Sequence, residues 1–214
     1  MPQSYSHVFM NELFGTIKLY HLKYNKIDLV CGTMPQPSDT SVIFCAEAAY
    51  TAQCLEQFSH SNIRGDHVSG GKRFRGSPCK NNTGAFVYYN NNYKFLHDSY
   101  TNELDSAAYY GGMGFSQELL IHDGSTISPV RKDTLGIYRC LCTIDNQLCI
   151  AECLKRMEIR FFVDYLLKIN VTDAIYLDMG PGWNYSWWRD DSNQVHYIHD
   201  KQIPYTTNWI TFYK

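Results

Sequence analysis

Short apolar runs separated by turn residues recur along the chain and predict a protein built largely from short strands. Residues 85–89 and 93–97 flank three consecutive asparagines, the arrangement of a β-hairpin. Residues 16–22 and 26–29, on either side of a Tyr-Asn pair, predict an opening hairpin. These segments indicate antiparallel pairing between strands that are neighbours in sequence.

The segments between these hairpins are less regular. Residues 41–46 form an apolar run typical of a buried strand, and residues 48–58 favour a helical turn or short helix. Residues 59–84 are rich in Gly, Ser, Asn, His and Arg and show no clear period, which predicts a long polar loop of functional interest. Residues 118–122, ahead of an Asp-Gly turn, predict another strand.

A longer unit follows between Arg139 and Asp178. An apolar strand begins at Arg139, Asp145 and Asn146 form a hairpin turn, and Asn170 can end a helix before the strand that leads to Asp178. One apolar stripe defines the helix: Leu154, Met157, Phe161, Phe162, Tyr165 and Leu166. The order strand, hairpin, helix, strand should bring the first and last strands side by side. We therefore expect an α+β (mixed α/β) fold, a single domain over residues 1–214 with few helices packed on the sheet.

Composition narrows the function classes only slightly. The 214 residues are 44% hydrophobic, enough to bury the core of one domain. A formal net charge of -2 gives no electrostatic reason to expect a nucleic-acid partner. No apolar run approaches the ~20 residues of a membrane span. The first residues lack the basic and apolar regions of a signal peptide, so the compartment stays undecided, with export possible if a leader is missing.

Eight cysteines do not follow the spacing of a zinc site. A two-residue turn at Asp145 and Asn146 would place Cys142 opposite Cys149, either as a cross-strand disulfide or as small buried hydrophobic residues. Cys54 and Cys79 flank a polar loop and are the other plausible pair.

The segment 172–189 carries the most chemistry. An apolar strand delivers Asp178 into a turn containing Gly180, and glycine lets the backbone approach a ligand closely. Trp183, Trp187 and Trp188 follow, and flat aromatic faces of this kind suit sugar rings. The alternative is a strand end with a capping aspartate and a tryptophan-rich core.

The order and spacing of residues 40–214 resemble the phosphodiester glycosidase domain family, whose members include the enzyme that uncovers mannose 6-phosphate. Arg139-Cys140-Leu141 is similar to the family's Arg-Thr-Ala strand, and residues 174–180 (AIYLDMG) are similar to its Ala-Leu-Asn-Leu-Asp-Gly-Gly-Gly segment. Asn208 lies in a strand similar to the family's closing strand. The family's Asn-Gly-Gly-Phe-Phe motif falls on residues 47–51, where Glu47 replaces the asparagine and both glycines are missing.

The resemblance implies a hydrolase that cleaves a sugar linked through a phosphodiester. Such a reaction needs cations that bind the departing phosphate and a carboxylate that acts as base, nucleophile or oxocarbenium stabiliser. Arg139 is the candidate phosphate clamp, and Asp178 and Glu47 are the candidate carboxylates. Arg139 could instead form a buried ion pair with Asp178 or Glu47.

Further candidate substrate-binding residues lie in loops. Asp66, His67, Arg73 and Arg75 belong to a Gly-rich basic segment that could bind an anion or simply be solvated. Gly112 lies in a second glycine-rich segment, and Gly180, Trp183 and Asn208 complete the set. Asp66 and His67 with His60 lack convincing metal-ligand spacing, so we expect no metal and no cofactor.

Two functions follow. The first is the hydrolase, acting on a small-molecule or glycan substrate. The second is a non-catalytic carbohydrate- or envelope-binding domain with the same fold and an exposed aromatic platform. The oligomeric state is not predicted.

Overall fold

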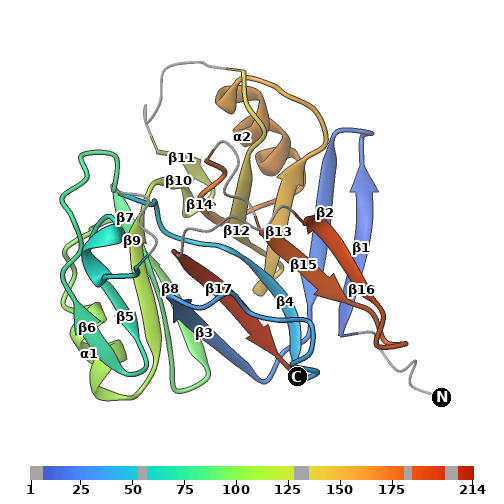
Figure 1. Cartoon of the computed structure of the whole chain (residues 1–214). Helices are drawn as coiled ribbons and strands as arrows, with labels where there is room; N and C mark the ends of the chain where they lie inside the picture. The colour runs from blue at the N-terminus through green and yellow to red at the C-terminus, as the bar shows by residue number, and fades with distance from the viewer. Residues whose placement is uncertain (1–6, 53–56, 128–134, 181–184, 201–206) are drawn as a thin grey trace.

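Strands dominate the structure. The computed structural model describes residues 7–52, 57–127, 135–180, 185–200 and 207–214 (Figure 1). Within these ranges there are seventeen strands, two α-helices and one 3-10 helix, the last at His60–Asn62. The strands form three sheets of seven, five and five strands, and every ladder within them is antiparallel.

The first sheet is β1 (Val8–Leu13), β2 (Ile17–Leu22), β13 (Gln147–Cys153), β12 (Arg139–Ile144), β14 (Asp173–Leu177), β10 (Leu119–His122) and β11 (Ser125–Thr126). The second sheet is β16 (Val195–His199), β15 (Ser186–Arg189), β4 (Val42–Glu47), β17 (Asn208–Tyr213) and β3 (Lys26–Cys31). The third sheet is β6 (Lys72–Phe74), β5 (His67–Ser69), β9 (Met113–Gln117), β7 (Gly84–Tyr89) and β8 (Asn92–Leu96).

The expected α+β class is wrong, because the described fold is mainly β. Its two α-helices are α1 (Glu103–Tyr109), against the third sheet, and α2 (Ile159–Lys168), on the first sheet (Figure 1). The order strand, hairpin, helix, strand is present as β12, β13, α2 and β14, and β12 pairs with β14. The hairpin reverses the chain before the helix, so β14 returns antiparallel to β12 and not as a parallel crossover strand.

Three local expectations are also wrong. Strands β2 and β3 do not form a hairpin, since β2 pairs with β1 and β13 whereas β3 pairs with β17 in another sheet. The described part of residues 48–58 is not helical, and Thr51 there makes an isolated bridge with Ile63. The polar stretch 59–84 is not one loop, because it contains β5 and β6.

The hairpins with asparagine turns are confirmed. Strands β7 and β8 pair around Asn90 and Asn91, whose φ angles are 51° and 57°. Strands β12 and β13 pair around Asp145 and Asn146, whose φ angles are 50° and 60°. Two successive residues of positive φ match the right-handed twist of paired strands, and asparagine and aspartate tolerate that conformation.

Side chains alternate between two cores across the first sheet. On β12, Leu141 points into a central core shared with the second and third sheets, where it joins residues such as Phe86 and Phe212. Cys140 and Cys142 point to the opposite face, into a second core that contains the apolar side of α2. Neither of the two described α-helices has the length and apolar character needed to cross a bilayer.

Candidate functional site

The ends of three strands, one from each sheet, meet at the carbonyl oxygen of Ala48. Ala48 follows β4, and its carbonyl accepts hydrogen bonds from the backbone N–H of Asp178 at 3.0 Å and from Nε2 of Gln117 at 3.2 Å. Asp178 directly follows β14, and Gln117 is the last residue of β9. This three-sheet junction, defined by Glu47, Ala48, Gln117 and Asp178, therefore brings together polar groups from distant parts of the sequence.

The carboxylate of Asp178 is held by backbone donors. Its Oδ2 accepts from the N–H of Thr51 at 3.1 Å, and its Oδ1 accepts from the N–H of Gly180 at 3.1 Å. The hydroxyl groups of Thr51 and Thr207 lie 2.6 Å apart, joining a third segment to this site. Asp178 is 8% exposed. These backbone hydrogen bonds fix the orientation of the Asp178 carboxylate at the junction.

Glu47 lies at the same junction with an unusual environment. The residue is 1% exposed, and neither carboxyl oxygen has a hydrogen-bond partner among the described residues. Burial raises the pKa of Glu47 well above its ordinary value, and the negative charge of Asp178 raises it further, against the opposing charge of Arg139. Burial and the neighbouring carboxyl group of Asp178 therefore both favour the protonated form of Glu47.

Arg139 is in the interior and forms an ion pair with a residue that the sequence did not single out. Its guanidinium donates to Oε2 of Glu152 from Nε at 2.7 Å and approaches the same oxygen from Nη2 at 2.5 Å. Nη2 also donates to the hydroxyl of Ser186 at 3.0 Å. Burial works to raise the pKa of Glu152, but Arg139 and His199 outweigh it and hold the pKa at about 2. Arg139 is fully buried, so its charge acts on Glu47 from within the protein.

A third buried carboxyl group lies near the junction. Glu118 is fully buried between β9 and β10, its carboxyl oxygen Oε2 accepts from the hydroxyl of Tyr50, and its backbone carbonyl accepts from the N–H of Tyr176. Burial raises the pKa of Glu118 to about 8. The neutral form is therefore favoured in the folded protein.

We expect Glu118→Gln to weaken the pH dependence of folding. The folded-state pKa of about 8 lies above the ordinary value of 4.5, so stability from this group is present below about pH 4.5 and is lost as the pH rises toward 8. In the wild-type protein the free energy of unfolding should fall by on the order of 3 kcal/mol between pH 5 and 8. Urea denaturation at several pH values checks this; equal slopes for variant and wild type would contradict the assignment.

An open pocket adjoins the junction. Its volume is about 410 Å³, and its lining comprises Tyr50, Thr51, Arg64, Pro78, Cys79, Lys80 and Asn81. Thr51 is the residue whose N–H binds Asp178, so the pocket and the carboxylate share one backbone segment. Arg64 and Lys80 provide two cationic side chains in the lining. Accessible positive charge near Asp178 therefore comes from these residues, since Arg139 is buried.

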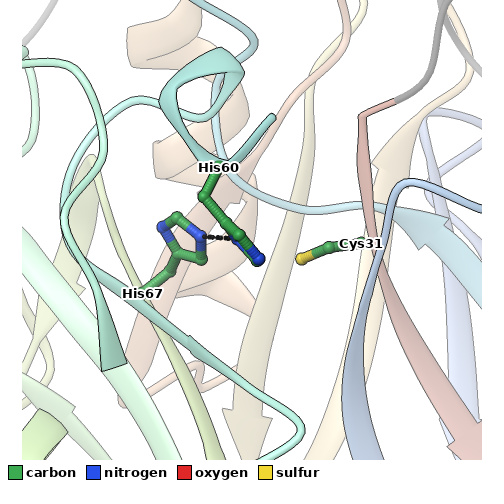
Figure 2. A group of neighbouring side chains, drawn as sticks. All are labelled: Cys31, His60 and His67. Atoms are coloured by element: carbon green, nitrogen blue, oxygen red, sulfur yellow. Dashed lines mark hydrogen bonds between the residues drawn. The ribbon is translucent and has the colours of Figure 1, made fainter. Parts of the chain in front are cut away.

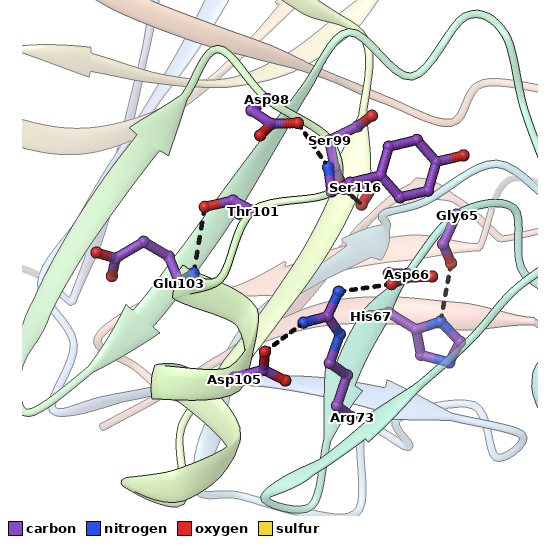
Figure 3. A network of polar contacts seen from close by, with 11 residues as sticks. Gly65, Asp66, His67, Arg73, Asp98, Ser99, Thr101, Glu103, Asp105 and Ser116 are labelled. Atoms are coloured by element: carbon purple, nitrogen blue, oxygen red, sulfur yellow. Dashed lines mark hydrogen bonds and ion pairs between the residues drawn. The ribbon is translucent and has the colours of Figure 1, made fainter.

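The basic segment predicted to bind substrate lines a neighbouring pocket of about 380 Å³. Its lining comprises Gly65, Asp66, Arg73, Arg75, Gly76, Pro78 and Tyr100. Arg73 lies between two carboxylates, at 2.7 Å from Oδ2 of Asp66 and 2.8 Å from Oδ2 of Asp105 (Figure 3). Arg73 thus joins β6 to α1 through ion pairs, whereas Arg75 lines the pocket.

The other predicted binding residues are dispersed. His67 belongs to a cluster with His60 and Cys31 (Figure 2) and is not one of the residues that define the three-sheet junction. Gly112 precedes β9, at the opposite end of that strand from Gln117, and an added Cβ would lie 2.1 Å from the carbonyl oxygen of Tyr88. Close packing therefore explains this glycine.

Asn208 has a clear role at the junction. Its Oδ1 accepts from the N–H of Ala49 at 2.8 Å, and its Nδ2 donates to the carbonyl of Ala49 at 3.0 Å. This pair of bonds extends β17 alongside the segment that follows Glu47. Asn208 and Gly180 thus position the backbone around Asp178.

The tryptophans do not form the flat exposed platform expected of a binding module, as far as the described ranges show. Trp187 is fully buried and donates from Nε1 to the carbonyl of Pro35 at 3.2 Å. Trp188 is partly buried and stacks on His196, with ring centroids 4.3 Å apart. Trp183 lies outside the described residues.

The cysteine expectation is resolved in part. Cys142 and Cys149 are directly opposite each other across β12 and β13, as the two-residue turn predicted. Both are buried free thiols, which is the hydrophobic alternative. Cys79 is free as well, and Cys54 lies outside the described residues.

Several site residues were missed in the sequence. Glu152 interrupts an otherwise apolar strand, the same signal that identified Glu47, whereas Glu118 follows Ser116 and Gln117 and gives no such signal. Arg64 and Lys80 lie in the polar stretch 59–84, where their positions gave no signal for this pocket. Thr51 contributes a backbone N–H, which no side-chain pattern reveals.

Comparisons with known proteins support the fold. The catalytic domain of zebrafish N-acetylglucosamine-1-phosphodiester alpha-N-acetylglucosaminidase, auto-inhibited by its pro-peptide, superposes with a TM-score of 0.65. The match covers 100% of this chain and 85% of that chain at 11% sequence identity. No family model and no curated protein matches the sequence. The chain therefore shares the fold of that catalytic domain.

Proposed function

We propose that this protein is a glycosidase-type hydrolase that cleaves a sugar linked through a phosphodiester, at the three-sheet junction. The observation that carries the proposal is the pairing of Glu47, buried with both carboxyl oxygens unpartnered among the described residues, with the oriented carboxylate of Asp178. Buried carboxyl pairs with separated protonation states are typical of glycoside-cleaving sites. The shared fold with a phosphodiester glycosidase catalytic domain supports the same reaction class.

The two carboxyl groups take different roles. Asp178, the more exposed of the two, acts at the anomeric carbon as nucleophile, base or oxocarbenium stabiliser. Glu47 retains its proton and so avoids a second negative charge beside Asp178. The C–O bond to the phosphate breaks with its electron pair on the phosphate oxygen, and water supplies the hydroxyl of the released sugar.

The phosphate is expected to bind in the pocket that contains Arg64 and Lys80. Asp178 is not in the lining of this pocket, but Thr51 is, and its backbone N–H binds the Asp178 carboxylate. The leaving group is a phosphate monoester, which stays ionised and needs little proton transfer, so cationic contacts provide the main help to its departure. Arg139, the clamp expected from the resemblance, acts in this proposal as a buried charge behind the two carboxyl groups.

The experiment is a screen of sugar-1-phosphodiesters and nucleotide sugars for release of free sugar. Once the screen identifies a substrate, Arg64→Gln and Lys80→Gln should each raise its KM by roughly 10-fold or more, because each removes one charge-assisted contact to the phosphate. Lys72→Gln is the control, because Lys72 is exposed on β6 and outside the pocket lining.

Two outcomes would contradict the proposal. Saturable sugar binding without turnover across the screen would favour the carbohydrate-binding alternative. Turnover that is insensitive to Arg64 and Lys80 but sensitive to Arg75 would place the phosphate in the neighbouring pocket.

A further inference from the structure

A cluster of a thiol and two imidazoles lies between the second and third sheets. Cys31 ends β3, His60 begins the 3-10 helix, and His67 begins β5 (Figure 2). One potential ligand atom from each residue lies within 4.8 Å of the other two. Nδ1 of His60 is 2.9 Å from Nε2 of His67. Three soft or borderline donors therefore converge from three separate elements.

We propose that Cys31, His60 and His67 bind a Zn²⁺ ion. Thiolate and imidazole are the donors that Zn²⁺ prefers, and three protein ligands suffice when a fourth position is taken by water or another ligand. Tetrahedral zinc with these donors places them about 3.5 Å apart. The two imidazole nitrogens are 2.9 Å apart, and the three ligand atoms all lie within 4.8 Å of one another.

The surroundings orient the two imidazoles as ligands. Nδ1 of His67 lies 3.2 Å from the carbonyl oxygen of Gly65, so a proton on Nδ1 leaves the Nε2 lone pair directed toward His60 and the cluster. The ring of Phe74 stacks on His60 with centroids 3.4 Å apart and an interplanar angle of 8°. A second aromatic ring, that of Phe58, meets His60 edge-on at 5.2 Å. Each histidine thus has a neighbour that restricts its rotation.

Accessibility and protonation are compatible with an ion. Cys31 and His60 are only partly buried, which leaves a path for entry, whereas His67 is fully buried. Burial lowers the pKa of both histidines and raises the pKa of the Cys31 thiol to about 12. Neutral imidazole is the ligand form, and the bound cation would displace the thiol proton of Cys31.

The sequence did not connect these residues. The sequence grouped His60 and His67 as possible metal ligands only together with Asp66. In the structure Asp66 forms an ion pair with Arg73 instead. Cys31 lies on a strand of another sheet, and its contact with the histidines depends on packing between sheets. The cluster shares no residue with the three-sheet junction. The metal proposal therefore does not depend on the proposed hydrolase.

The first test uses the wild-type full chain, stripped of metal and titrated with Zn²⁺ against a chromophoric chelator. We expect one equivalent to bind and the melting temperature to rise. Co²⁺ in place of Zn²⁺ should give tetrahedral d–d bands in the visible and a thiolate-to-cobalt charge-transfer band in the near ultraviolet. Absence of the charge-transfer band, or no stoichiometric binding, would overturn the proposal without any variant.

The second test uses variants and matched controls. Cys31→Ser should abolish the charge-transfer band, and Cys31→Ser and His67→Gln should each weaken Zn²⁺ binding by at least about 100-fold. Cys79→Ser is the thiol control, because Cys79 is also a partly buried free cysteine. His122→Gln controls for the second cluster of possible ligands, formed by His122, Asp123 and Asp173. Loss of binding in either control, with Cys31→Ser unaffected, would refute the assignment.

Discussion

Replacing Asp178 by asparagine is expected to lower kcat of the proposed hydrolysis by about 10²- to 10⁴-fold, the range for removal of a reacting acid–base group. An amide keeps the shape of the carboxylate and can still accept a hydrogen bond from Thr51 or Gly180. It cannot act as nucleophile or base or stabilise an oxocarbenium ion by charge. Initial rates on the substrate found by the screen, together with melting temperatures, check this.

Asp173→Asn is the matched control. Asp173 begins β14, the strand that Asp178 follows, and its carboxylate lies 2.8 Å from Nδ1 of His122. Its loss should leave kcat within about 2-fold, because it lies at the opposite end of the strand from the junction. Full turnover in Asp178→Asn with unchanged melting would remove Asp178 from the reaction. Marked unfolding would assign Asp178 to strand capping instead.

The two hairpins with asparagine turns could be predicted from the sequence, whereas the fold class could not. Asparagine and aspartate pairs mark the turns of β7–β8 and β12–β13, because positive φ is a local requirement. Which sheet each strand joins depends on packing across the core. Strands β2 and β3 therefore follow one another along the chain yet belong to different sheets. The three-residue strands β5 and β6 are too short to show a periodic pattern.

The candidate site, like the fold, could be predicted from the sequence only in part. Asp178 and Glu47 could be found as polar residues at the ends of apolar strands, and the structure brings both to the carbonyl of Ala48. Glu152 was missed as the partner of Arg139, although the two-residue turn that places Cys142 opposite Cys149 also places Glu152 opposite Arg139. The accessible cations near Asp178 come from Arg64 and Lys80, whose positions depend on a loop without periodicity.

Arg139→Met is expected to lower the free energy of unfolding by about 3–5 kcal/mol, the cost of breaking a buried ion pair from one side. Methionine fills much of the volume, but it leaves the Glu152 carboxylate buried next to His199 without its main counter-charge. Arg160→Met is the control, because Arg160 pairs with Glu158 at the protein surface and such pairs contribute about 0–1 kcal/mol. Urea denaturation at pH 7 measures both differences.

A second substitution and the pH dependence separate lost charge from lost packing. Arg139→Met combined with Glu152→Gln should recover part of the stability, since no uncompensated carboxylate is then left in the interior. The pKa of Glu152 is lowered from 4.5 to about 2, so the stability contributed by the ion pair is present above about pH 4.5 and is lost as the pH falls toward 2. The difference between wild type and Arg139→Met should therefore shrink over that interval. A deficit that stays constant down to pH 2, with no recovery in the double variant, would show that Arg139 stabilises the fold through packing alone.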